Sequence, residues 1–198
     1  MKWKFAHIFF LIFGSLFMLT ESYGDENALF CRLQNISIEG KTNVNRFEFL
    51  YDTSSIKRIQ SCGENRDTPS SSNHAKFKLP VKAFDSDNKK MNRDFYKMLE
   101  TAQYPEIIVT IEKSKLQKMV NGELLSSIKL DLTLAGNTRT VNTDCSYLTK
   151  DSGDKIILKG KTKINLENFS LRPPRKMLGL IHVNETILIN FEVALNNI

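Results

Sequence analysis

Few of the residue types that perform catalysis or bind metals occur in a useful spacing in this 198-residue chain. His74 and His182 are far apart in the sequence, and neither belongs to an H-x-x-x-H or similar pair that would hold a metal ion. Asp85 and Asp87 fall in a polar turn, where hydrogen bonds to the turn backbone explain them without acid–base catalysis. No G-x-S-x-G, Walker or G-x-G-x-x-G motif is present. We therefore expect no enzyme and no cofactor; a hydrolase whose site is assembled only in space is the remaining catalytic alternative.

The first 24 residues have the composition of a secretory signal peptide. Two lysines precede an almost wholly apolar run over residues 5–20, and the short segment Ser22-Tyr23-Gly24, which contains two small residues, follows. The run is slightly shorter than the roughly 20 residues that span a membrane, so an N-terminal anchor is the less favoured alternative. We expect cleavage after Gly24, a single domain over residues 25–198, and a periplasmic or secreted location. Lipoprotein processing is not expected, because bulky Phe30 precedes Cys31.

An exported chain with three cysteines favours one disulfide and one free thiol. Cys145 alternates with Val141 and Thr143 in a strand-like segment, which suits a buried thiol. Cys31 and Cys62 flank early strands and are the slightly favoured pair, although the other pairings stay open.

The charge of the chain does not favour nucleic-acid binding. The formal net charge is +6, and loss of Lys2, Lys4 and Glu21 with the leader lowers it to +5. The lysines are scattered along strands and form no basic face with interleaved aromatic residues. Solvated strand faces explain them best, and a weak attraction to anionic lipid headgroups is the minority interpretation. We expect no nucleic-acid partner, consider transient contact with a membrane surface, and leave the oligomeric state open, a homodimer included.

Alternation of apolar and polar residues dominates the rest of the chain. Residues 128–134 alternate strictly, which predicts a strand with one buried face and one wet face. The other candidate strands, which bring the number to eight or nine, cover residues 33–39, 43–51, 55–61, 75–81, 107–111, 139–149, 156–166 and 187–195.

Only one segment has a helical period, and one long segment has no clear period. Met91, Phe95 and Leu99 lie on one apolar stripe, which predicts a helix over residues 91–102 that ends before Pro105 and packs on the sheet. Residues 168–185 contain two prolines and several apolar residues. We expect this segment to act as a lid over a barrel end, with Met177 and Leu178 pointing inward; packing on the outer wall is the alternative.

Many evenly spaced amphipathic strands with one helix predict an all-β fold, an antiparallel barrel of eight strands or nine segments with one helical insertion. Such a barrel is just wide enough to pack solid or to hold one slender ligand. The small inward residues Thr143, Cys145, Gly160 and Thr162 would leave space unless bulky residues opposite fill it, and the pattern does not decide between these outcomes.

Four motifs occur in the order in which one protein family has them. They are IEGKTNVNRF over residues 38–47; LPVKAFD, MNRDFY and YPEI within 79–107; LTLAGNTRTV over 132–141; and FSLRPP with GLI within 169–181. In these motifs, and over about residues 33–195, the chain resembles the YceI-like family, the polyisoprenoid-binding periplasmic proteins of bacteria. Two positions depart from the family pattern: Ala135 stands where His is frequent, and Ser170 where Gly is usual.

The resemblance implies a lipocalin-like barrel whose elongated apolar lumen binds a polyisoprenoid chain. The expected function is non-enzymatic binding and transport or storage of an elongated apolar lipid, a polyisoprenoid or an isoprenoid quinone. The alternative is a periplasmic interaction module with a packed barrel and no lumen ligand. From strand alternation, the helix and the long segment, we expect a continuous tunnel lined by Phe47, Phe49, Phe77, Leu79, Phe95, Leu99, Ile107, Val109, Ile111, Leu130, Leu132, Ile164, Met177, Leu178, Ile189 and Phe191.

Overall fold

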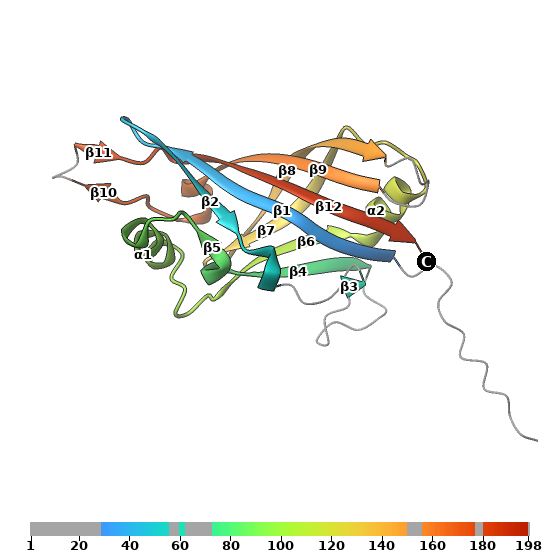
Figure 1. Cartoon of the computed structure of the whole chain (residues 1–198), viewed down its shortest axis with the longest axis horizontal. Helices are drawn as coiled ribbons and strands as arrows, with labels where there is room; N and C mark the ends of the chain where they lie inside the picture. The colour runs from blue at the N-terminus through green and yellow to red at the C-terminus, as the bar shows by residue number, and fades with distance from the viewer. Residues whose placement is uncertain (1–28, 56–59, 62–72, 150–155, 177–179, 198) are drawn as a thin grey trace, which may run out of the picture.

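A computed structural model describes residues 29–55, 60–61, 73–149, 156–176 and 180–197. In this part of the chain, one ten-stranded antiparallel sheet curls into a nearly closed barrel (Figure 1). The order along the sheet is β4-β6-β7-β8-β9-β12-β1-β2-β5, and β3 pairs with β1 outside this path. The all-β barrel expected from the sequence is confirmed.

The elements follow the chain in this order: β1 (Leu29–Lys41), β2 (Arg46–Tyr51), the 3-10 turn η1 (Thr53–Ser55), β3 (Gln60–Ser61), β4 (His74–Pro80), η2 (Val81–Ala83), β5 (Phe84–Asp85), α1 (Lys89–Met98), β6 (Glu106–Glu112), α2 (Lys113–Val120), β7 (Ser127–Leu134), β8 (Asn137–Thr149), β9 (Ile156–Asn165), η3 (Leu166–Phe169), β10 (Arg175–Lys176), β11 (Ile181–His182) and β12 (Thr186–Asn197). The first and last strands pair antiparallel along most of their length. Figure 1 places α1 and α2 at opposite ends of the long axis of the barrel.

The strand faces follow the alternation of the sequence. Along β7, Ile128, Leu130, Leu132 and Leu134 are all buried, while the residues between them are exposed or half-buried. Apolar residues from the other long strands join them in one core. The turn from β7 to β8 is a two-residue hairpin, because Leu134 pairs directly with Asn137.

The first helix begins and ends earlier than the apolar stripe predicted. The Asn88 side chain accepts hydrogen bonds from the backbone N–H groups of Lys90 and Met91, which caps the N-terminus of α1. The helix ends at Met98, because Glu100 takes a left-handed conformation with φ of 51°. Phe95 and Leu99 are buried against the barrel, as expected.

Two further expectations differ from the structure. The helix α2 was not predicted, since its apolar stripe is short; Leu116 and Met119, one turn apart, are its buried residues. The strand expected over residues 55–61 is reduced to Gln60–Ser61, and residues 56–59 lie outside the described part. Within the described residues, none of the helices has both the length and the apolar composition to cross a membrane.

Candidate apolar binding site

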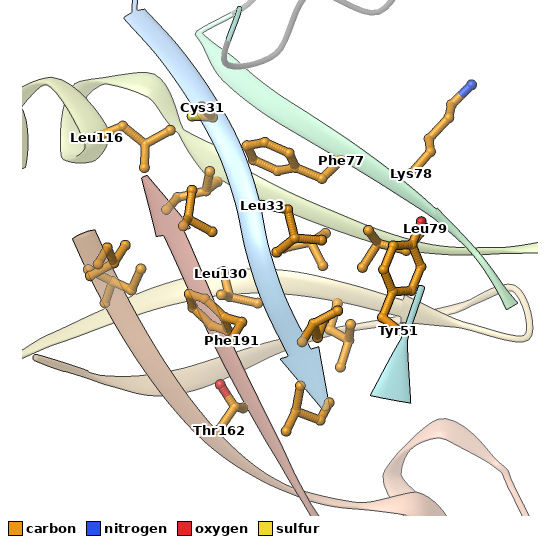
Figure 2. Close-up of a pocket in the computed structure, with 18 of the residues that line it drawn as sticks. Cys31, Leu33, Tyr51, Phe77, Lys78, Leu79, Leu116, Leu130, Thr162 and Phe191 are labelled. Carbon is orange, nitrogen blue, oxygen red and sulfur yellow. The ribbon is translucent and has the colours of Figure 1, made fainter. Parts of the chain in front are cut away.

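A hollow of about 490 Å³ lies inside the barrel. Its wall is built from inward-facing residues of β1, β4, β6, β7, β8, β9 and β12, with Tyr51 of β2 and Leu116 of α2 (Figure 2). The rings of Phe77 and Phe191 and the side chains of Leu33 and Leu130 border this space in Figure 2. We call it the larger hollow.

The lining of the larger hollow is almost entirely hydrocarbon. Its few polar side chains include Lys78, whose ammonium group points away from the space (Figure 2). Thr162 is another, and its Oγ1 lies 2.6 Å from Oγ1 of Thr143, so the two buried hydroxyls satisfy each other. Such a wall offers an apolar molecule about 25 cal/mol for each Å² of surface removed from water, and it presents no charge.

A smaller hollow of about 40 Å³ lies under α1. It is lined only by apolar residues, among them Phe84, Phe95 and Leu99. It shares five lining residues with the larger hollow, so the two spaces adjoin: Ile36, Leu79, Val109, Leu132 and Ile189.

The sequence pattern of the YceI-like domain matches residues 34–195. The chain belongs to the YceI-like family. The similar solved structures include a polyisoprenoid-binding domain from Saccharophagus degradans implicated in plant cell wall breakdown, with a TM-score of 0.55, 18% identity, and coverage of 88% of this chain and 97% of that one. Another is BcnA of Burkholderia cenocepacia, with a TM-score of 0.54, 16% identity, and coverage of 81% and 94%. At these identities the two structures show a shared fold. A comparison with curated proteins found no match to the chain.

Half of the lumen residues expected in this YceI-like chain line the larger hollow: Phe77, Leu79, Val109, Ile111, Leu130, Leu132, Ile189 and Phe191. Phe95, Leu99 and Ile107 line only the smaller one. Met177 and Leu178 lie outside the described residues. That any of these side chains binds a ligand stays a prediction.

Phe47, Phe49 and Ile164 lie in neither of these two hollows. Phe49 and Ile164 are buried in the core, and the ring of Phe47 packs over Gly40 on β1. Their inward faces fit the alternation, and Phe49 stacks on the ring of Phe95 from α1. The described members of the expected set are therefore divided among the two adjoining hollows and these three residues, which line neither.

Several wall residues were absent from the expected set. Cys31, Leu33 and Ile36 of β1 and Val193 and Leu195 of β12 line the larger hollow. The alternation over residues 187–195 already pointed to the last two. Leu116 had no such signal, because its helix was not recognised.

The described part of the long segment does not reach the larger hollow. Phe169 and Leu171 are buried, whereas Leu180 is 72% exposed, so not all of its apolar residues are covered. Asn43 at the β1–β2 turn donates from Nδ2 to the carbonyl of Leu180 at 2.9 Å, and its Oδ1 accepts from the N–H of His182 at 3.2 Å. These bonds attach the segment to the β1–β2 turn, and the expected lid contacts of residues 177–179 lie outside the described part.

Neither of the two cysteines that the structure describes offers a thiolate nucleophile to the larger hollow at neutral pH. Cys31 is disulfide-bonded, and its favoured partner, Cys62, lies outside the described residues. Cys145 is a free thiol, and burial, with a smaller effect from the charge of Asp144, raises its pKa to about 11. It is therefore protonated at neutral pH. In the described part, no group of three His, Cys, Asp or Glu side chains is placed to hold a metal ion.

Proposed function

We propose that this protein binds an elongated apolar lipid, a polyisoprenoid or an isoprenoid quinone, in the larger hollow and transports or stores it without chemical change. The single observation that carries the proposal is the apolar hollow of about 490 Å³ inside the barrel. Membership of the YceI-like family and the fold shared with a polyisoprenoid-binding domain support it.

The physical basis of binding is burial of hydrocarbon. An isoprenoid chain has no charge to recognise, so its affinity for the protein comes from about 25 cal/mol per Å² of apolar surface removed from water. A membrane already provides most of that gain. The hollow therefore shields the isoprenoid chain from water while the protein carries it between membranes. Selectivity among apolar lipids comes from the shape of the wall.

We also propose that the chain is exported and that it receives its cargo during transient contact with a membrane surface. The leader-like composition of residues 1–24 supports export to the periplasm or the medium. Because the cargo is nearly insoluble in water, transfer during contact is faster than transfer through solution. An intact mass that corresponds to a chain beginning at Asp25 tests the export step.

Organic extraction of the natively purified protein, followed by mass spectrometry, tests the binding function. The proposal predicts an isoprenoid or similar lipid in a substantial fraction of molecules, absent from an unrelated exported protein purified in parallel. If delipidated protein also fails to take up any isoprenoid from vesicles, the alternative of an interaction module with an empty barrel replaces this one.

A further inference from the structure

We propose that the α1 end of the barrel is a stop that limits the length of the hydrocarbon chain that the larger hollow accommodates. This inference rests on the proposed function and names the class of chain that the site selects. It combines the volumes of the two hollows with the aromatic packing under α1.

The two hollows follow one another along the barrel. Leu116 of α2 borders the larger one, and Phe95 and Leu99 at the α1 end border the smaller one. Since α1 and α2 lie at opposite ends of the long axis, a chain in the larger hollow that extends toward α1 meets the smaller hollow next (Figure 1). The five shared residues, Leu79 and Leu132 among them, border both spaces.

The space beyond these shared residues is closed by aromatic rings. Phe95 stacks on Phe49 with ring centroids 4.3 Å apart and planes 26° apart, and it meets the edge of Phe84 at 6.1 Å. All three rings are buried. The helix that carries Phe95 is fastened to β5, because the Tyr96 hydroxyl donates to the carbonyl of Phe84 at 3.0 Å. A chain end therefore meets a wall that is already well packed.

The two volumes show where the room for a chain ends. The larger hollow measures about 490 Å³ and the smaller one only about 40 Å³. A chain that fills the larger hollow therefore finds little further space toward α1.

Binding of prenyl alcohols of increasing length to the delipidated full chain, measured by displacement of a fluorescent apolar probe, tests the stop. We expect the affinity to rise about tenfold or more for each added unit up to a levelling-off length below eight units, and less than about twofold for each unit after that. Phe95→Ala should move this levelling-off to longer chains by at least about one unit. Met98 also lines the smaller hollow and is only half-buried, so Met98→Ala opens the same space with less disturbance of the core and should move the levelling-off in the same direction.

Phe169→Ala is the matched control, since Phe169 is also a fully buried ring but lines neither of the two hollows. It should lower stability and leave the levelling-off length unchanged. Two results would overturn the stop without affecting the proposed lipid binding. One is a wild-type affinity that keeps rising up to eight units. The other is a levelling-off length that is unchanged in both Phe95→Ala and Met98→Ala. If the wild type binds no prenyl alcohol of any length, the proposed function fails, and the stop fails with it.

Discussion

The ring of Phe191 on β12 lies against the backbone of Gly160 on β9, its direct partner across the strand pair. A Cβ atom at position 160 would overlap the ring. Phe191 also lines the larger hollow. Because Gly160 has no side chain, the Phe191 ring can lie close to β9, and this position of the ring forms part of the wall of the hollow. The same arrangement recurs between Gly40 and Phe47 on β1 and β2.

Gly160→Ala should lower the free energy of unfolding by about 1–2 kcal/mol. Alanine in a strand ordinarily gives a free energy of unfolding about 0.5–1 kcal/mol higher than glycine does. Forcing the Phe191 ring off its position costs about 1–3 kcal/mol, so the clash outweighs this gain and the variant is destabilised. Urea unfolding measures the change. Adding Phe191→Leu to Gly160→Ala should recover part of the loss, and a single variant as stable as the wild type would show that the ring moves freely.

The buried pair Thr143 and Thr162 predicts a strongly non-additive double-mutant cycle. Thr162→Val leaves the Thr143 hydroxyl without its partner, which should lower stability by about 1–3 kcal/mol, and Thr143→Val should do the same. The double variant replaces both hydroxyls by methyl groups and should lie within about 1 kcal/mol of the wild type. Losses that simply add in the double variant would contradict this account of the pair.

Ser170→Gly should stabilise the protein by about 0.5–1 kcal/mol. Ser170 ends η3 with φ of 59°, in the left-handed region that glycine adopts without steric cost. Its side chain is exposed, so little packing is lost. Ser146→Gly, at an exposed strand position of β8 without a positive φ, is the matched control and should destabilise. If both substitutions have the same sign, the backbone conformation at residue 170 is not the cause.

Alkylation of Cys145 should be slow at neutral pH and should accelerate with a midpoint near pH 11. Burial raises the pKa of the Cys145 thiol from 9.0 to about 11 in the folded state. As the pH rises, the thiol of the unfolded state therefore loses its proton first. The contribution of this thiol to stability falls as the pH rises from about 9 to about 11. Iodoacetamide labelling followed by intact mass gives the profile. In guanidinium chloride the midpoint should fall to about 8.5–9, and a folded-state midpoint below 9 would contradict the burial of the thiol.

The strand faces were predictable because alternation depends only on which side of a sheet each residue points to. Ile128 to Leu134 were therefore assigned correctly, as was the inward face of the helix that carries Phe95. Alternation does not predict where along the barrel axis an inward residue lies, and so it does not predict whether that residue borders a hollow. Phe49 and Ile164 are buried as expected, yet neither lines either hollow, and Phe49 instead stacks on the ring of Phe95 from α1.

The space inside the barrel was also only partly predictable. The small inward residues Gly160 and Thr162 left open whether bulk opposite fills the barrel. In the structure, the Phe191 ring occupies the position over Gly160, and a hollow nevertheless remains beside it. Leu116 could not be assigned to the wall, because it comes from a helix of eight residues whose short apolar stripe is a weak signal.

The most direct test of the central claim is binding of a prenyl alcohol to two neighbouring tryptophan variants. Val141 lines the larger hollow, and Asn142, the next residue of β8, is exposed on the opposite face. Val141→Trp fills the hollow with an indole ring and should weaken binding at least about tenfold, whereas Asn142→Trp should leave it within about twofold of the wild type. Both variants must keep the wild-type circular dichroism spectrum. Equal binding by the two folded variants would contradict the claim that the lipid occupies the inside of the barrel.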